Sequence, residues 1–218
     1  MKVLWLVHGW GFSPGFWRPL MAQLPGWRVV RADLGYYGPT SHLQPPEEPH
    51  IAMGHSLGFL HILRQLGGAG ASCRGVVGIN AFARFSRCEN FPQGIHPRIL
   101  ERMMRQMSQQ PGEVLQEFRH RSGWESGVEI PTSLQMESLL AGLRFLLEED
   151  GRSLLKKIDH PLLILASQDD QIVPPSLTHA SFPAPMDLRW HKEGGHVLPL
   201  LHPQWCSEQL LDWLQHLI

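Results

Sequence analysis

Short apolar segments recur along the chain, separated by stretches of mixed polarity. Segments of this length that are rich in Val, Ile and Leu predict β-strands. The predicted strands cover residues 3–7, 27–31, 51–54, 75–79, 162–166 and 187–191. Four of these segments are almost continuously apolar, which is typical of parallel strands that are covered by helices on both faces. The pattern therefore predicts an α/β fold.

Helical spacing fills several of the intervals between the predicted strands. One helix is expected directly after Ser56, where apolar residues recur three or four positions apart, at Phe59, Leu60, Leu63 and Leu66. Another is expected from Pro203 to Leu217, because proline is well tolerated in the first turn of a helix. We therefore expect a mostly parallel sheet flanked by helices.

Residues 82–155 interrupt this alternation, because they contain no convincing strand. The stretch "HPRILERMMRQMSQQ" (96–110) has the spacing of an amphipathic helix. Its apolar stripe consists of Ile99, Leu100, Met103, Met104 and Met107, and its basic stripe consists of Arg98, Arg102 and Arg105. Further helices are expected at "EVLQEF" (113–118) and from about residue 132. We interpret residues 82–155 as a helical cap inserted into a core made of residues 1–81 and 156–218.

Composition narrows the class of protein. With 218 residues the chain is long enough for one full-sized domain. Its net charge of −1 lacks the basicity expected of proteins that bind nucleic acids or membrane surfaces. Its three cysteines are odd in number and form no CxxC pair, which disfavours a disulfide framework and a zinc site. The first apolar run has only five residues, too few for a signal-peptide core or a transmembrane helix, so we expect a cytoplasmic protein.

The sequence "GHSLG" at residues 54–58 stands between a predicted strand and a predicted helix. A G-x-S-x-G nucleophile elbow requires this context, because its tight turn lifts the serine above the sheet. Gly54 and Gly58 would remove side chains that clash in such a turn. Ser56 is therefore the candidate nucleophile, and the alternative is a serine that only caps the following helix.

A serine hydroxyl needs a base at neutral pH, and that base needs an orienting acid. The stretches "SQDDQIVPP" and "EGGHVLPLLHP" each follow a predicted strand, and open α/β sheets bind ligands at the carboxyl ends of their strands. His196 is the candidate base, because it follows two glycines in such a loop. The candidate acid is Asp169 or Asp170, and the alternative is that both aspartates only cap a turn.

The sequence "HGWG" at residues 8–11 follows the first predicted strand. Hydrolysis of an ester needs N–H donors that stabilise the developing oxyanion, and the backbone N–H groups of Trp10 and Leu57 are the candidates. A tight turn is the simpler interpretation of His8 and Gly9, and it is compatible with this role. No metal site is expected, because His191 and His196 have no third ligand nearby and no HExxH pattern is present.

Together, "HGWG", "GHSLG", "DDQIVP" and "GGH" resemble the motifs of the α/β-hydrolase superfamily across almost the whole chain. The order of the candidates, Ser, Asp and His, is also the order in α/β-hydrolases. Hydrolases of this kind carry the acid four residues before the proline of a D-x-x-V-P loop, and counting back from Pro174 favours Asp170. Within the superfamily, "HGWGFSPGFW", "FPQGIHPRILERMMRQMS" and "HVLPLLHP" resemble the BioH-type pimeloyl-acyl-carrier-protein methyl ester carboxylesterases of biotin synthesis.

This resemblance implies a serine carboxylesterase that hydrolyses the methyl ester of a pimeloyl chain carried on acyl carrier protein, with no cofactor. It also implies that an arginine-rich cap receives the acidic carrier protein. By their position in the cap region, the arginines that the resemblance assigns to this role are Arg98, Arg102, Arg105, Arg119 and Arg121. The alternative for these arginines is a solvated helix face. We expect a monomer with no nucleic-acid or membrane partner.

Two features depart from the family pattern. A Pro-rich connector replaces the helix that family members usually carry before "HIAMGHS", and Phe59 occupies a position often held by glycine. Neither change involves Ser56, Asp170 or His196. Two other functions remain open: a general short-chain carboxylesterase, thioesterase or lactonase of the same fold, and a non-catalytic receptor. Such receptors tend to lose a catalytic residue, and here all three candidates are present.

Overall fold

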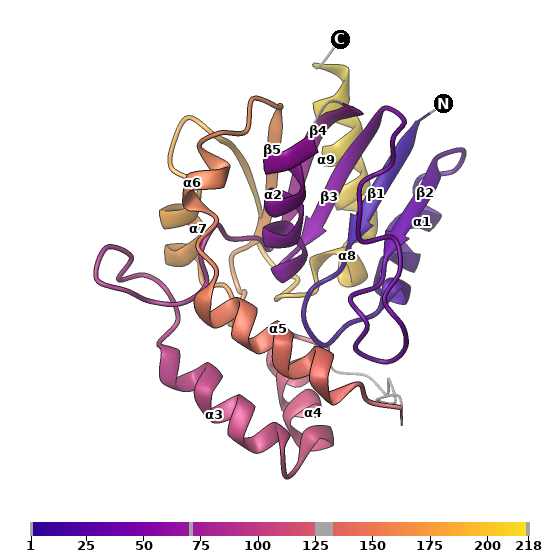
Figure 1. The fold of residues 1–218 in the computed structure, drawn as a ribbon. Helices are drawn as coiled ribbons and strands as arrows, with labels where there is room; N and C mark the ends of the chain where they lie inside the picture. The colour runs from indigo at the N-terminus through magenta and orange to yellow at the C-terminus, as the bar shows by residue number, and fades with distance from the viewer. Residues whose placement is uncertain (1, 70–71, 125–132, 217–218) are drawn as a thin grey trace.

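The protein is built on one parallel β-sheet (Figure 1), and the computed structural model describes residues 2–69, 72–124 and 133–216. The strand order is β2-β1-β3-β4-β5-β6, and every neighbouring pair is parallel. The strands are β1 (Val3–Val7), β2 (Arg28–Ala32), β3 (His50–His55), β4 (Cys73–Ile79), β5 (Leu162–Ser167) and β6 (Asp187–His191). Each lies where the apolar pattern predicts a strand, so the predicted α/β fold is confirmed.

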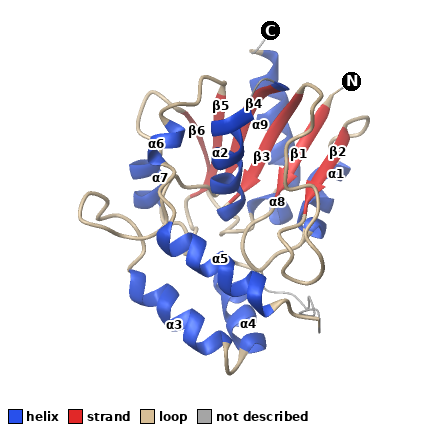
Figure 2. Cartoon of the chain, viewed as in Figure 1, coloured by secondary structure: helices blue, strands red, loops and turns tan. Residues whose placement is uncertain are grey.

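Helices cover both faces of the sheet (Figures 1 and 2). One face carries α2 (Leu57–Ala69), α6 (Arg152–Leu155) and α7 (Pro175–Ser181), and the other carries α1 (Arg18–Ala22), α8 (Leu198–Leu201) and α9 (Pro203–Gln215). A Cβ at Gly75 of β4 would lie 2.5 Å from Trp213 of α9. On the opposite face, a Cβ at Gly78 would lie 3.0 Å from Phe59 of α2. These contacts leave no room for larger side chains between the layers.

Burial explains the apolar pattern from which the strands are predicted. All residues of β1 and β3 are buried, and those of β5 are buried except for the partly buried Leu162. A strand covered on both faces must be apolar at successive positions rather than at alternate ones. The edge strands β2 and β6 are mostly half-buried, and their sequences "RVVRA" and "DLRWH" are accordingly mixed.

Three further helices lie over the carboxyl ends of the strands, away from the two chain termini (Figure 1). They are α3 (Pro97–Met107), α4 (Pro111–Arg121) and α5 (Met136–Glu148). The first two lie where helices are predicted, whereas the third begins at Met136, and residues 125–132 lie outside the described residues. The ends of this insertion meet where Arg84 bridges Asp150 and donates from Nη1 to Oδ2 at 2.9 Å.

The limits of the cap at residues 82 and 155 remain a prediction. Helix α6, which those limits assign to the cap, lies against α2 of the core: a Cβ at Gly151, just before α6, would be 2.8 Å from Leu60. The expected Pro-rich connector is present, since residues 33–49 contain no helix (Figure 2). Within the ranges that the structure describes, no helix is both long and apolar enough to cross a bilayer.

Candidate active site

Ser56 occupies a tight turn between β3 and α2. Its φ of +54° lies in the left-handed region, which non-glycine residues rarely adopt and which is found mainly at functional sites. A Cβ at Gly54 would lie 2.5 Å from Cα of Phe59, and one at Gly58 would lie 2.2 Å from the carbonyl oxygen of Val7. The turn can therefore form only with glycine at both positions, as the G-x-S-x-G pattern predicts.

The side chains of Ser56, His196 and Asp170 form a continuous chain of hydrogen bonds. His196 Nδ1–H donates to Asp170 Oδ2 at 2.8 Å, which leaves Nε2 free to accept from the Ser56 hydroxyl at 2.9 Å. His196 is fully buried, and Ser56 and Asp170 are 5% and 4% exposed. Because water is largely excluded, these hydrogen bonds are stronger than they would be at the surface. The arrangement can move a proton from the serine hydroxyl to a base that faces a carboxylate.

The structure distinguishes the two candidate acids. Asp170 Oδ1 accepts from the N–H groups of Ile172 and Val173, both at 2.8 Å, so the carboxylate is held by its own turn. Asp169 is exposed, and its Oδ1 accepts from the N–H of Gly195 at 2.9 Å. Asp170 therefore faces His196, whereas Asp169 binds the backbone of Gly195, in the loop that precedes His196.

Two further residues, which the sequence motifs do not indicate, contact these side chains. His55 Nε2–H donates to the carbonyl oxygen of His196 at 2.7 Å, and its ring stacks on Phe16 with centroids 4.4 Å apart. Burial lowers the pKa of His55 well below 6.5, so it is a neutral donor. Asn80, directly after β4, donates from Nδ2 to Asp170 Oδ2 at 2.8 Å. A polar residue that ends a buried strand at the carboxyl edge of the sheet is the sequence signal that points to Asn80.

The "HGWG" loop passes close to Ser56. A Cβ at Gly9 would lie 3.0 Å from Ser56 Cβ. His8 holds the loop, because its Nδ1–H donates to Gly9 O at 2.9 Å and its Nε2 accepts from Leu34 N–H at 3.2 Å. Among the described residues, the N–H groups of Trp10 and Leu57 make no backbone hydrogen bond, so both remain available as donors.

A cavity of about 530 Å³ lies between the core and the three helices above it, and Ser56 lines it. Its apolar walls consist of Trp10, Phe85, Ile95, Ile99, Leu100, Met103, Val114, Phe118, Leu143, Leu146 and Ile172. Its polar part consists of Arg102, Gln106, Gln110, Glu113, Glu117, Arg121 and Gln171. The cavity can therefore hold an apolar chain beside Ser56 while a polar end reaches the surface.

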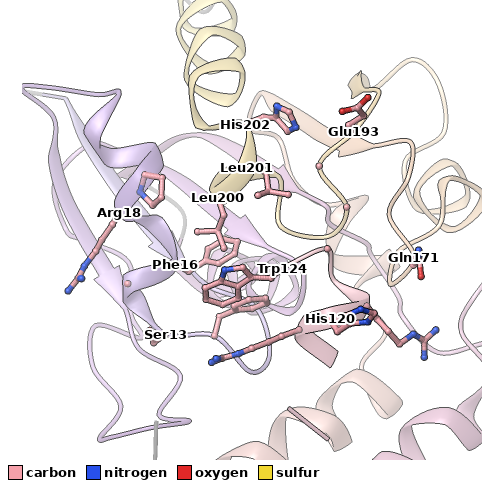
Figure 3. A pocket seen from close by; sticks show the side chains of 18 of the residues that line it. Ser13, Phe16, Arg18, His120, Trp124, Gln171, Glu193, Leu200, Leu201 and His202 are labelled. Atoms are coloured by element: carbon pink, nitrogen blue, oxygen red, sulfur yellow. The ribbon is translucent and has the colours of Figure 1, made fainter. Parts of the chain in front are cut away.

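A second hollow of about 1060 Å³ lies beside this cavity (Figure 3). It is formed by the 3-10 helix η1 (Pro14–Trp17), the end of α4 and the loops after β5 and β6. Figure 3 shows Trp124 and Phe16 near its centre, with Leu200 and Leu201 on one side. Ser56 does not line this hollow, but Arg121 and Gln171 line both spaces, so the two adjoin at these side chains.

The candidate carrier-binding arginines do not share one environment. Arg98, Arg102, Arg105 and Arg121 are exposed on α3 and α4. Arg119 is only 7% exposed, donates to Tyr37 Oη at 3.0 Å and lies 5.0 Å from the ring of Trp124. A surface contact with a carrier protein is therefore a wrong expectation for Arg119. The helical spacing could have shown this, because Arg119 follows the buried Leu115 by four positions.

No group of three or more His, Cys, Asp or Glu side chains that could hold a metal ion occurs among the residues with described positions. The three cysteines are free thiols, and Cys73 and Cys206 are buried.

No family model matches the chain, but comparison with known proteins finds similar sequences and similar structures. A pimeloyl-[acyl-carrier protein] methyl ester esterase of Stenotrophomonas maltophilia (strain R551-3) is 28% identical over 223 residues, covering 90% of this chain and 83% of that protein. The protein of the same name from Xylella fastidiosa (strain M23) is 28% identical over 243 residues, covering 98% and 93%. Among solved structures, an esterase from Exiguobacterium antarcticum matches with a TM-score of 0.86 at 18% identity, covering 99% of this chain and 92% of that one.

The strand order, the position of the Ser56 turn and these likenesses agree with the superfamily that the sequence motifs indicate. The chain has the α/β-hydrolase fold, and its sequence is similar to those of pimeloyl-[acyl-carrier protein] methyl ester esterases over most of its length.

Proposed function

We propose that this protein is a serine carboxylesterase that hydrolyses the methyl ester of pimeloyl-acyl carrier protein. The observation that carries the enzymatic part is the buried hydrogen-bonded chain from Ser56 through His196 to Asp170, which opens into a largely apolar cavity. The substrate is inferred from the names of the similar curated proteins, which describe esterases acting on this ester.

In the proposed reaction, Ser56 Oγ attacks the ester carbonyl carbon while His196 Nε2 takes the hydroxyl proton. Asp170 stabilises the imidazolium that forms, because its carboxylate already accepts from His196 Nδ1. The backbone N–H groups of Trp10 and Leu57 hold the oxyanion. His196 returns its proton to the methoxide as the carbon–oxygen bond breaks, and methanol leaves. Water then attacks the acyl-enzyme by the same steps, which releases the carboxylate and regenerates Ser56.

The proposed acyl site is the cavity beneath α3, α4 and α5. A pimeloyl chain is apolar between its two carboxyl ends, so it fits a space with apolar walls and a polar opening. Arg102 and Arg121 line this cavity and are also exposed. We propose that they and the exposed Arg98 and Arg105 attract the acidic carrier protein.

The experiment that tests the enzyme is loss of the nucleophile. Ser56→Ala should lower kcat on a short p-nitrophenyl ester by roughly 10⁴–10⁶, because residues of such a triad act as one unit. A fluorophosphonate probe should label the natural protein at Ser56 and leave the variant unlabelled. Substantial esterase activity in Ser56→Ala would contradict the assignment. A folded natural protein that is not labelled would favour a non-catalytic receptor.

A second experiment tests the carrier. Reversing three charges in Arg98→Glu/Arg102→Glu/Arg105→Glu should lower kcat/KM on the carrier-bound methyl ester roughly tenfold or more at low salt, because attraction of the acidic carrier raises the association rate. An acetate ester, whose acyl group is too short to extend to the polar part of the cavity where Arg102 lies, should react at a nearly unchanged rate. The matched control, Lys156→Glu/Lys157→Glu/Lys192→Glu, changes three exposed lysines of the core by the same charge. Equal losses in the two variants, or an equal loss on the acetate ester, would contradict docking at α3.

Growth of cells that lack the methyl esterase separates the proposed substrate from the wider class. Expression of this chain should restore growth without biotin. Fluorophosphonate labelling without rescue would favour a general short-chain carboxylesterase, thioesterase or lactonase.

A further inference from the structure

Asn80 is a buried polar residue that the proposed reaction does not use. It follows β4, is 1% exposed and has a φ of +46°. Its Nδ2 lies 2.8 Å from Asp170 Oδ2, 3.1 Å from Gly195 O and 3.5 Å from Ser167 Oγ. The Asp170 oxygen that it contacts is the same oxygen that accepts from His196.

The orientation of the Asn80 amide follows from these partners. A carboxylate oxygen and a carbonyl oxygen both accept hydrogen bonds, so only the NH₂ end of the amide can face them. Its two hydrogens then serve Asp170 and Gly195. The other end, Oδ1, is buried without a hydrogen-bond partner among the described residues. A buried acceptor without a partner lowers stability. The hydrogen bonds of Nδ2 to Asp170 and Gly195 must therefore offset the cost of leaving Oδ1 unpaired.

Asn80 completes the set of donors around Asp170. The carboxylate accepts from Ile172 and Val173 at Oδ1 and from His196 and Asn80 at Oδ2. An ionised carboxylate offers about four such positions, so Asp170 has a donor for each. The second hydrogen of Asn80 reaches the residue before His196, so one amide connects the acid with the loop of the base.

We propose that Asn80 is a positioning residue for the proposed ester hydrolysis. Its side-chain amide fixes the position of Asp170 relative to the loop of Gly195 and His196. This inference rests on the proposed function. Asn80 does not line the cavity beside Ser56, so it acts on the substrate only through Asp170 and His196.

The hydrogen bond from Asn80 also affects how strongly Asp170 attracts the proton on His196. Part of the negative charge on Oδ2 is taken up by the Asn80 N–H. Without this donor, Asp170 would stabilise the imidazolium form of His196 more strongly. His196 must be neutral to accept the proton of Ser56, so the acid side of the pH–rate profile would move to higher pH.

Other titratable groups near this cluster stay unchanged when Asn80 is replaced. The ring of His55 lies 4.8 Å from that of His196, His8 acts electrostatically on His55, and Asp169 accepts from Gly195 N–H. Helix α4 and the turn after it contribute the uncharged Phe118 and Ser122. A shift in the profile can therefore be assigned to the lost amide.

Two variants and one control test the proposal. Asn80→Gly removes the amide and tolerates the positive φ. Asn80→Asp keeps the shape but replaces the donor with an acceptor beside Asp170. Ser167→Ala removes the nearby hydroxyl without touching Asp170 and is expected to behave like the natural protein. Fluorophosphonate labelling of Ser56 in the natural protein is measured first, since its absence would refute the proposed function and this inference with it.

We expect kcat on a small ester to fall roughly ten- to a hundredfold in both variants with KM nearly unchanged, which is less than the roughly 10⁴-fold cost of losing the acid itself. The acid side of the profile should move up by about half a pH unit in Asn80→Gly and by about one unit in Asn80→Asp. The low-field proton NMR signal of His196 Nδ1–H should move in both variants.

Thermal unfolding monitored by circular dichroism separates positioning from stability. If both variants are folded at the assay temperature and keep the natural kcat, pH profile and low-field signal, the proposal is overturned while the proposed function stands. A lower melting temperature with an unchanged pH profile would also overturn it, because that result describes a purely structural residue. If Asn80→Asp does not fold, the pH profile and the low-field NMR signal of Asn80→Gly still test the proposal.

Discussion

Single atoms decide whether the Ser56 turn can form. The carbonyl oxygen of Val7 lies where a side chain at residue 58 would begin, and the backbone of Phe59 lies where one at residue 54 would begin. His55 has a different constraint, because its buried ring must stay neutral to pack on Phe16 and donate to His196 O. The turn thus depends on missing side chains and on one uncharged ring.

Gly58→Ala should destabilise the protein by about 3 kcal/mol, because the new methyl group meets backbone that cannot move aside. Urea unfolding measures the loss. The control is Gly112→Ala on α4, where a Cβ meets nothing within 4 Å. We expect that control to be neutral or slightly stabilising, as alanine is favoured over glycine in a helix. Similar effects of the two changes would contradict the packing argument.

His55 should make stability fall at acidic pH. Its pKa is lowered by burial in the folded protein, so the unfolded chain, with a pKa of about 6.5, binds the proton more tightly. The contribution is complete above about pH 6.5 and is lost as the pH falls below it. His55→Gln, whose amide can also donate to His196 O, should lose less stability between about pH 7 and 5. Melting temperatures across this range test the difference, and identical slopes would refute it.

Neighbouring elements are joined at the base of the insertion by Asp150. Its carboxylate accepts from Arg84 at 2.9 Å and from Arg152 Nη2 at 2.7 Å, next to the start of α6. Hydrogen bonds from Arg152 lower the pKa of Asp150 to about 2. Asp150 therefore connects Arg84, at the start of the insertion, with Arg152, at the start of α6 and shortly before β5.

Asp150→Asn should lower the free energy of unfolding at pH 7 by roughly 1 kcal/mol, a value reduced for screening because the side chain is about one-third exposed. The folded pKa is depressed, so the contribution is complete above about pH 4 and disappears as the pH falls toward 2. Urea unfolding of both proteins at several pH values measures this. A difference that persists unchanged at pH 3 would point to lost packing instead of charge.

The whole molecule creates the cavity at Ser56, because neither the sheet nor the helices above it enclose it alone. Trp10 and Ser56 form its floor, and residues from α3, α4 and α5 form its walls. Trp10 also joins the two parts, since its Nε1–H donates to Leu139 O of α5 at 2.9 Å. The position of the helices over the sheet therefore sets the size of the cavity at Ser56, and with it the acyl length that the proposed esterase would accept.

Val114 of α4 lines this cavity, so a larger and a smaller side chain there should change the acyl-chain preference in opposite directions. Val114→Phe should reduce kcat/KM for medium-chain p-nitrophenyl esters relative to the acetate by about tenfold, because each methylene in an apolar pocket contributes a similar factor. Val114→Ala should shift the preference toward longer chains. The ratio of kcat/KM values across a chain-length series is the measurement. Parallel changes for all chain lengths in both variants would show that the cavity is not the acyl site.

Local properties of this chain are predictable from its sequence. The strands are predictable because burial on both faces forces consecutive apolar residues, and the Ser56 turn is predictable because its glycines lie within five positions. A local pattern that is compatible with two environments is not sufficient. Arg119 matches the basic residues of a helix surface, yet its position on the apolar side of α4 buries it beside Tyr37 and Trp124.

Local apolar patterning and motif spacing predict the α/β fold, the order of the strands along the chain, and Ser56 and His196 as candidate nucleophile and base. The structure adds that Asp170 faces His196 whereas Asp169 does not, that Asn80 and His55 contact this group of residues, and that a cavity opens at Ser56. The cause is distance along the chain, because Ser56, Asn80, Asp170 and His196 follow four different strands. Periodicity describes neighbours in sequence, whereas these contacts depend on how the packed sheet brings its carboxyl edge together.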